Sequence, residues 1–206
     1  MPQTPPPAAP PWQVLAEEIE FETPFMRARR QKCRTQRGAI VDPYHVFDMP
    51  NWAAILAVTP DMRAVLVRNY RHGAQRSVVE LPGGLIDDAD MDSQSAAARE
   101  LLEETGHSVA AIHALPPIHP YPGRFRQQAF PYLGVGAVKT ATQALEPDED
   151  LDVFTVPLAD AFRLFSDGSV DVAAVHAGIM LAALHTIIRT PALADLRRAL
   201  PADMAW

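Results

Sequence analysis

The sequence is poor in cysteine and in positive charge. Its one cysteine, Cys33, cannot form an internal disulfide, which is typical of proteins from a reducing cytosol. Its 25 acidic residues outnumber 18 lysines and arginines, and the net charge is −7. This balance argues against broad binding of a nucleic acid backbone, which needs a basic surface. The negative net charge is compatible with a small phosphorylated ligand, because a bound metal ion can neutralise the charge of that ligand.

Long apolar runs are also absent. The most apolar stretch, residues 170–188, contains Asp171, His176 and His185 and is too polar to span a membrane. The N-terminus lacks a basic region followed by an apolar run, so no signal peptide is predicted. We therefore expect a cytoplasmic protein that binds neither membranes nor nucleic acid.

Proline is abundant at one end of the chain. Six of the 20 prolines lie within residues 1–11, which carry no periodic apolar pattern and are predicted to form a disordered tail. The whole sequence of 206 residues is 48% hydrophobic and 21% charged. This composition is typical of a globular protein that is large enough to bury one substantial core.

The order of the predicted elements indicates an α+β domain with helices packed on a mixed sheet. Strands are predicted at residues 12–21, 26–35, 44–49, 52–58, 64–71, 77–81, 109–114, 128–138 and 153–156, with a turn region at 38–43. Helices are predicted at residues 94–105, 157–165 and 173–189, with a short one ending near residue 200. Asp92 or Ser93 can cap the first helix, and Gly106 can end it.

The first predicted helix has an acidic face. Glu103 and Glu104 follow Glu100 by three and four residues, so the three carboxylates share one side of the helix. Like charges so placed repel one another, whereas Mg²⁺ or Mn²⁺ prefers oxygen ligands of this kind. The pattern is compatible with a metal site and, equally, with a solvated acidic face.

Gly84 and the run from Arg99 to Gly106, R-E-L-L-E-E-T-G, resemble the Nudix box. That motif reads G-x5-E-x7-R-E-U-x-E-E-x-G-U, where U is a bulky aliphatic residue. The first glutamate of the motif falls on Asp90, one residue further from Arg99 than the pattern has it, and His107 takes the last aliphatic position. Neither position normally supplies the main metal ligands.

The flanking sequence is similar to the ADP-ribose pyrophosphatase branch of this family. The similarity lies in residues 66–71, 80–84, 146–153 and 167–171, and in Pro122, fifteen residues beyond the box. It implies an α/β/α sandwich around a mixed sheet, with an N-terminal strand-rich extension. It also implies a dimer-forming region at residues 12–58, a Nudix hydrolase domain with C-terminal helices at 59–206, and a homodimer.

The resemblance implies a metal site on the acidic helix. Glu100 and Glu104 would bind Mg²⁺ or Mn²⁺, Glu103 would assist, and the Gly83 carbonyl would serve as a backbone ligand. Arg99 would hold the glutamates in place, since its planar guanidinium is suited to carboxylates.

The resemblance also suggests a general base and substrate contacts. Glu149 is the best match for the base, with Asp148 and Glu146 as rivals, and each could instead be a solvated acid. Arg71 and Arg124 would contact substrate, as could Arg126. Their alternative role is that of surface charges.

The function implied is metal-dependent hydrolysis of the pyrophosphate bond of ADP-ribose or a related nucleoside diphosphate sugar. The products would be a nucleoside monophosphate and a sugar phosphate. Alternatives are another nucleoside diphosphate derivative, such as a dinucleotide cofactor, or a Nudix module that senses a nucleotide without hydrolysing it. The three box glutamates disfavour the sensor, because such modules usually lose them.

Overall fold

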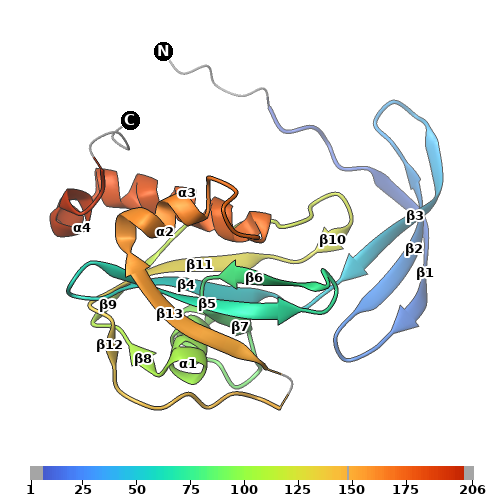
Figure 1. Ribbon diagram of the computed structural model, residues 1–206. Coiled ribbons are helices and arrows are strands. Elements are labelled where there is room, and N and C mark those ends of the chain that lie inside the picture. Colours follow the sequence, from blue (N-terminus) through green and yellow to red (C-terminus); the bar gives the residue numbers. More distant parts are fainter. Residues whose placement is uncertain (1–6, 148, 202–206) are drawn as a thin grey trace. The chain divides into compact units, whose positions relative to one another are not determined.

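The computed structural model describes residues 7–147 and 149–201 of the chain (Figure 1). These residues fold as two compact units. The first unit consists of residues 7–50 and 121–127, and the second consists of residues 51–120 and 128–201, each within the described ranges. Residues 1–6 of the predicted tail lie outside the described residues.

The first unit is a four-stranded sheet in the order β1-β2-β3-β10. The strands are β1 (Gln13–Glu22), β2 (Arg27–Arg34), β3 (Ile40–Asp48) and β10 (Phe125–Arg126). The first three strands form an antiparallel meander, and β10 pairs in parallel with β3. The first two strands follow the predicted pattern.

The third strand starts earlier than predicted, because β3 runs through residues 40–43, where a turn was expected. Proline is uncommon inside a strand, since it has no N–H to donate to the hydrogen bonds of a sheet. Here, however, β10 pairs only with Phe47 and Asp48, so the other side of β3 is open at Pro43. The pairing with β2 also shifts register between Gln31 and Cys33. Proline is tolerated at such a site.

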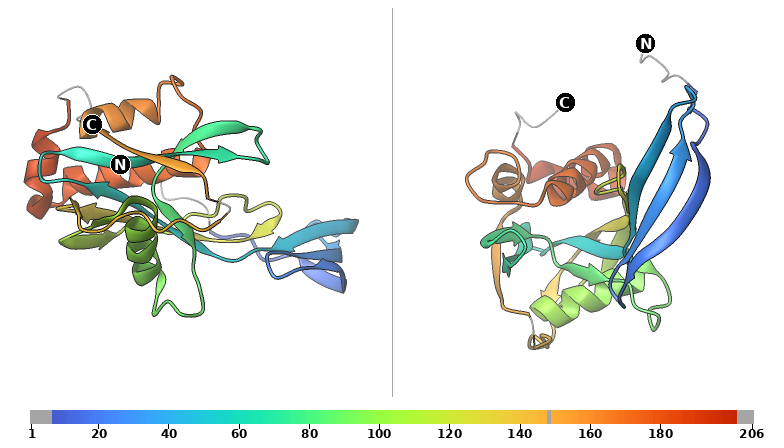
Figure 2. Two further views of the ribbon diagram at one scale, coloured as in Figure 1. Left: turned by 60° about the horizontal axis from the view of Figure 1, so that its bottom comes forward. Right: turned by 90° about the vertical axis from the view of Figure 1, so that its right-hand side faces the viewer.

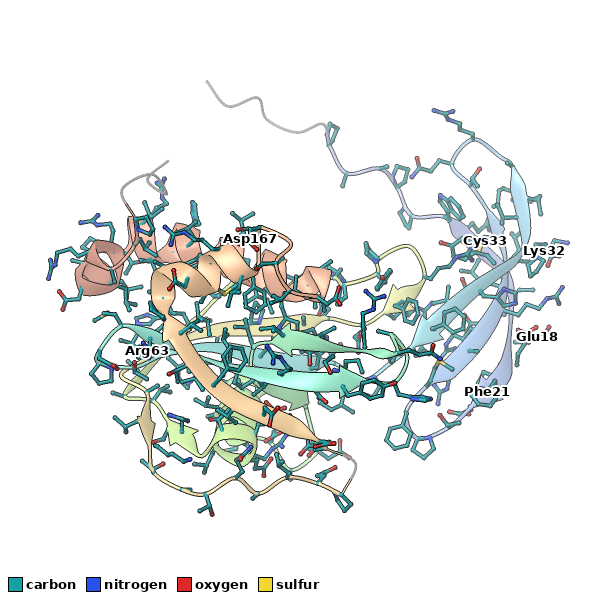
Figure 3. The ribbon with its side chains drawn as sticks, viewed as in Figure 1. Glu18, Phe21, Lys32, Cys33, Arg63 and Asp167 are labelled. Carbon is teal, nitrogen blue, oxygen red and sulfur yellow. The ribbon has the colours of Figure 1, made fainter. Side chains whose placement is uncertain are left out.

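The edge strand β1 is exposed along its whole length. Large apolar side chains on this strand and around it are more than a third exposed, and they include Trp12, Val14, Leu15, Ile19, Phe21, Phe25 and Ile40. Phe21 is labelled in Figure 3. A long exposed edge strand that carries apolar side chains is a template for pairing or packing with another chain.

The second unit is built on a seven-stranded mixed sheet. Its strands are β4 (Trp52–Val58), β5 (Arg63–Arg71), β6 (Arg76–Glu80), β7 (Gly83–Leu85), β9 (Ala111–Ala114), β11 (Ala129–Val135) and β13 (Leu151–Pro157). The main order is β13-β5-β4-β11-β9, while β6 pairs with β5 and β7 with β4. A separate pair joins β8 (His107–Ser108) to β12 (Val138–Lys139). The sequence grouped β4 with the N-terminal strands, but it lies in this sheet.

Helices cover both faces of this sheet (Figures 1 and 2). One face carries α1 (Ser93–Thr105), and the other carries α2 (Leu158–Leu164), α3 (Ala174–Arg189), a 3-10 turn (Pro191–Leu193) and α4 (Ala194–Arg198). Successive β4 side chains alternate between the two cores, as a pleated strand requires. Ile55 packs with Leu101 of α1, and Leu56 packs in the core that contains Ile179 of α3. The predicted α/β/α sandwich around a mixed sheet is confirmed.

The two central strands β4 and β5 are paired over only part of their length. β4 and β5 pair directly only at Ala57–Val65 and Val58–Ala64. Beyond that point β6 continues beside β5 and β7 beside β4, so the chain from Leu81 to Gly83 crosses from one strand to the other. This crossover places the glycine turn next to α1.

The described helices include no single one that is long and apolar enough to cross a membrane. The residues of α3 and the 191–198 segment meet the length and composition criteria only as a pair, which is bent by 102°.

Candidate active site

Three glutamates converge beside the crossover. Glu100 and Glu104 project from α1, and Glu149 comes from the loop that precedes β13. One carboxylate oxygen from each lies within 4.8 Å of the other two. Glu100 and Glu104 are buried, with 8% and 4% of their surface exposed. Carboxylates so deeply buried and so close together need a compensating positive charge.

The pKa values of the two buried glutamates reflect this environment. Burial and, after it, the charges of Glu100 and Glu149 raise the pKa of Glu104 to about 8, against a hydrogen bond from the Gly83 N–H. Burial likewise raises the pKa of Glu100 to about 7, although the neighbouring Arg99 opposes the shift. A bound cation would restore the ionised forms, because an opposite charge favours them.

Helix α1 is capped at both ends. Asp92 accepts a hydrogen bond from the Ser95 N–H, and the Ser95 hydroxyl oxygen accepts one from the Asp92 N–H, which is a reciprocal cap. Gly106 ends the helix in the left-handed conformation at φ 72°. Both caps agree with the sequence, and Asp92 rather than Ser93 is the N-cap.

Arg99 ties the glutamates to the loop before the helix. Its guanidinium donates to Glu100 at 2.9 Å, to Glu103 at 2.8 Å and to the Leu85 carbonyl at 3.0 Å. It also bonds both carboxylate oxygens of Asp90, at 3.1 and 3.0 Å, and this lowers the pKa of Asp90. The loop is one residue longer than in the Nudix motif, but it still places the Asp90 carboxylate against Arg99.

Glu103 lies outside the glutamate cluster. Its side chain is 42% exposed and is paired with Arg99. Among the described residues, the carboxylates close enough to share a metal ion are those of Glu100, Glu104 and Glu149, and the assisting role of Glu103 stays a prediction.

Two glycines allow the chain to pass close to the cluster. The Gly83 N–H donates to Glu104 Oε2 at 2.9 Å. A Cβ atom on Gly84 would lie 2.6 Å from the Glu100 carboxylate carbon, and one on Gly83 would lie 2.7 Å from the Ala54 Cα. A Cβ atom at Gly84 would have to displace the Glu100 carboxylate, and one at Gly83 would press against backbone.

Comparison with known proteins agrees with this geometry. The NUDIX domain profile matches residues 49–174, and the profile of the nucleoside diphosphate sugar hydrolase N-terminal domain matches residues 12–47. The chain belongs to the Nudix hydrolase family. The predicted enzyme family and its ADP-ribose pyrophosphatase-like branch are thereby confirmed.

Several characterised proteins are similar to this Nudix chain. An ADP-ribose pyrophosphatase of Mycobacterium tuberculosis is 30% identical over 196 residues, 95% of this chain and 91% of the relative. An ADP-ribose pyrophosphatase of Bacillus subtilis is 29% identical over 59% of this chain and 65% of the relative. A crystal structure described as an ADP compounds hydrolase has a TM-score of 0.71 at 19% identity, covering 88% of this chain and 97% of the other. The structural likeness supports the fold.

The loop that carries Glu149 is attached to the C-terminal end of the Nudix helix. The Gly106 carbonyl accepts a hydrogen bond from the Thr140 N–H, and the Glu103 carbonyl accepts one from the Ala144 N–H, both at 2.8 Å. Further along, Glu149 Oε2 accepts the N–H of Glu146 at 2.8 Å. These contacts bring a residue far from the Nudix box in sequence to the two buried glutamates.

The other two acids proposed as the base are placed differently. Glu146 is exposed, and its carboxylate is not part of the cluster. Asp148 lies outside the described residues. Glu149 is therefore the acid of this loop that the described structure brings to the Nudix glutamates.

The predicted substrate arginines fall in different units. Arg71 lies at the end of β5, with half of its side chain exposed, and it pairs with the buried Glu80 at 2.8 Å. Arg124 belongs to the first unit, where its guanidinium lies 4.1 Å from the centre of the Tyr44 ring and donates to the His45 carbonyl. Arg126, in the same unit, approaches Asp48 at 3.5 Å.

Proposed function

We propose that the protein hydrolyses the pyrophosphate bond of ADP-ribose or a related nucleoside diphosphate sugar with the help of Mg²⁺. The products would be a nucleoside monophosphate and a sugar phosphate. The observation that carries the proposal is the cluster of the buried Glu100 and Glu104 with the half-buried Glu149, whose carboxylates can stay ionised together beside a cation. The similarity to an ADP-ribose pyrophosphatase over 95% of the chain supports the substrate class.

The donor set fits a hard divalent ion. Glu100, Glu104 and Glu149 offer carboxylate oxygens, which Mg²⁺ and Mn²⁺ prefer, and the cluster contains no sulfur or imidazole ligand. The proposed ligands are Glu100 and Glu104, with the Gly83 carbonyl and with Glu103 in a supporting place. When bound, Mg²⁺ would neutralise pyrophosphate charge and acidify a water molecule.

The remaining residues of the site have proposed roles in positioning and proton transfer. Arg99 fixes Glu100 against the loop before α1. Glu149 is the proposed general base, since it lies within reach of the glutamates but on a separate loop, where it can accept a proton from water. Arg71 and Arg124 are proposed to contact the phosphates or the nucleoside. The half-exposed guanidinium of Arg71 is held by Glu80 and is suited to bind a phosphate.

Incubation with ADP-ribose and Mg²⁺ tests the proposal, with mass identification of the products. We expect AMP and ribose 5-phosphate, and no turnover when EDTA is added. A panel of other nucleotide sugars and dinucleotide cofactors serves as the comparison. Turnover of a panel member but not of ADP-ribose would contradict the substrate. No turnover of any of these compounds would contradict a hydrolase function and would favour a Nudix module that senses a nucleotide without hydrolysing it.

We also propose that the first unit mediates a homodimer, because the exposed apolar edge of β1 is the kind of surface that a second copy would cover. Sedimentation is expected to give twice the 22.6 kDa mass of one chain. Replacing both Ile19 and Phe21 with lysine should give a monomer. Replacing Leu181 with lysine, an exposed apolar residue of α3, should leave the dimer intact. A wild-type monomer would contradict the proposal.

The proposed location is the cytoplasm. The single thiol, Cys33, is buried and unpaired on β2. A lone reduced cysteine fits a reducing compartment.

A further inference from the structure

The crossover between β6 and β7 is held from both helical layers. It consists of Leu81 and Pro82 and leads into Gly83, the first residue of β7; proline has no N–H to donate. The Leu81 N–H donates to Nδ1 of His176 on α3, at 3.2 Å. The Gly83 N–H donates to Oε2 of Glu104 on α1, at 2.9 Å. The N–H groups on either side of Pro82 are therefore each bonded to a side chain, one from α3 and one from α1, which lie on opposite faces of the sheet.

His176 is in a fixed tautomer. Because Nδ1 accepts the Leu81 N–H, the ring proton of the neutral imidazole is on Nε2, which lies 3.8 Å from Oε1 of Glu80. The residue is 5% exposed, and burial, with the charge of Arg71, lowers its pKa to about 3. The ring of Trp52 lies 5.5 Å away, centre to centre, and limits rotation.

The start of α3 is attached to the same strand that leads into the crossover. The Val79 N–H donates to the Asp171 carbonyl at 2.9 Å, and Val79 forms a parallel bridge with Val172. Arg76 pairs with the Asp171 carboxylate at 3.1 Å. The segment before α3 thus runs beside β6 and brings His176 to the crossover.

We infer that His176 is a positioning residue of the active site, which fixes the crossover so that Gly83 and Glu104 keep the geometry of the metal site. The inference rests on the proposed metal-dependent hydrolysis and deepens it. Leu81 is 2% exposed, so removal of its acceptor leaves a buried N–H without a partner. The chain can relieve that cost by shifting, and Gly83 is only two residues away.

The alternative is a packing role, since His176 stands in the most apolar stretch of the sequence. A packing role predicts that an apolar residue of similar size suffices. The positioning role predicts that an acceptor is needed at the place of Nδ1. Asparagine supplies one, because its Oδ1 occupies the place of histidine Nδ1, whereas the Oε1 of glutamine corresponds to Nε2.

The experiment compares His176→Asn, His176→Gln and His176→Leu with the wild type. His185→Leu, an exposed position on the same helix, is the matched control. Three quantities are measured: Mn²⁺ affinity without nucleotide, the amide chemical shift of Gly83 in the metal-free protein, and kcat and KM for ADP-ribose. Thermal unfolding followed by circular dichroism verifies that each variant is folded.

We expect the Leu and Gln variants to lose about 10-fold or more in Mn²⁺ affinity and in kcat, which is typical for loss of a residue that orients a metal ligand. The Gly83 signal should shift in both, KM should change less than kcat, and the Asn variant and the control should stay near wild type. Asn and Gln have the same chemistry, so the comparison holds even if the Leu variant does not fold.

Unchanged Mn²⁺ affinity and an unchanged Gly83 signal in His176→Gln would overturn the inference and leave a packing role. Failure of the proposed function gives a different result. The wild type would then neither bind Mn²⁺ nor hydrolyse any nucleoside diphosphate derivative, while the Gly83 signal would still report whether His176 fixes the crossover.

Discussion

Replacing Glu104 with glutamine is expected to reduce kcat by about three orders of magnitude while the protein stays folded. Losses of about this size follow removal of one preorganised group that stabilises transition-state charge. The glutamine can still accept the Gly83 N–H through its Oε1, so the crossover is retained. What is lost is a negatively charged oxygen in the cluster with Glu100 and Glu149. Steady-state assays with ADP-ribose and Mg²⁺ provide the measurement.

The same substitution is expected to stabilise the metal-free protein at alkaline pH. The pKa of Glu104 is raised from 4.5 to about 8, so between these values the folded state binds more protons than the unfolded state. Wild-type stability therefore falls as pH rises from about 4.5 to about 8. Glutamine removes the contribution of Glu104 to this dependence, while that of Glu100 remains, and should raise the free energy of unfolding at pH 8 by on the order of a few kcal/mol.

Glu103→Gln is the matched control for both effects, because Glu103 lies next to Glu104 but is 42% exposed and outside the cluster. It should lose much less activity and should leave the pH dependence of unfolding almost unchanged. Urea unfolding in EDTA at pH 5 and pH 8 measures the stability. Equal losses of kcat in both variants would contradict the proposal that Glu104 is a main metal ligand and Glu103 only a supporting residue.

Replacing Gly84 with alanine is expected to reduce kcat by about 10²-fold with little loss of stability. The added Cβ would meet the Glu100 carboxylate, which is the mobile end of a side chain and can move away. Folding then tolerates the change, but the displaced carboxylate no longer faces the cluster. Misplacement of a reacting group by about 1 Å can cost this much in rate. Circular dichroism and the ADP-ribose assay separate the two effects.

Two further glycines serve as controls. A Cβ on Gly73 would meet no atom within 4 Å, so Gly73→Ala should behave as the wild type. A Cβ on Gly83 would press against the Ala54 backbone, which cannot move without disturbing the sheet, so Gly83→Ala should lower the unfolding temperature. A Gly84→Ala enzyme with full activity would show that the position of Glu100 is not critical.

The sequence was most informative about helix α1. Its capping residues and the R-E-L-L-E-E-T-G run are local signals, and helix geometry alone places Glu100 and Glu104 on one side. The layered fold followed from the order of strands and helices and from the family resemblance.

The sequence could not show that Glu149, rather than Glu103, lies beside the carboxylates of Glu100 and Glu104. Both are acids near the box helix, and only tertiary structure shows that Arg99 pairs with one while the loop before β13 brings the other to the cluster. The bond of His176 to the crossover has no local signal either, because its partner is a backbone N–H 95 residues away. Contacts of this kind depend on how the layers pack.

The attachment of the Glu149 loop to α1 sets the reach of this acid. Glu149 lies between Ala144, whose N–H is bonded to α1, and Leu151, the first residue of β13. One added residue lengthens such a tether by up to about 3.5 Å. The entropic cost is small, since doubling a loop costs only about 0.6 kcal/mol. An insertion here would therefore let Glu149 move further from Glu100 and Glu104 while both stay fixed on α1.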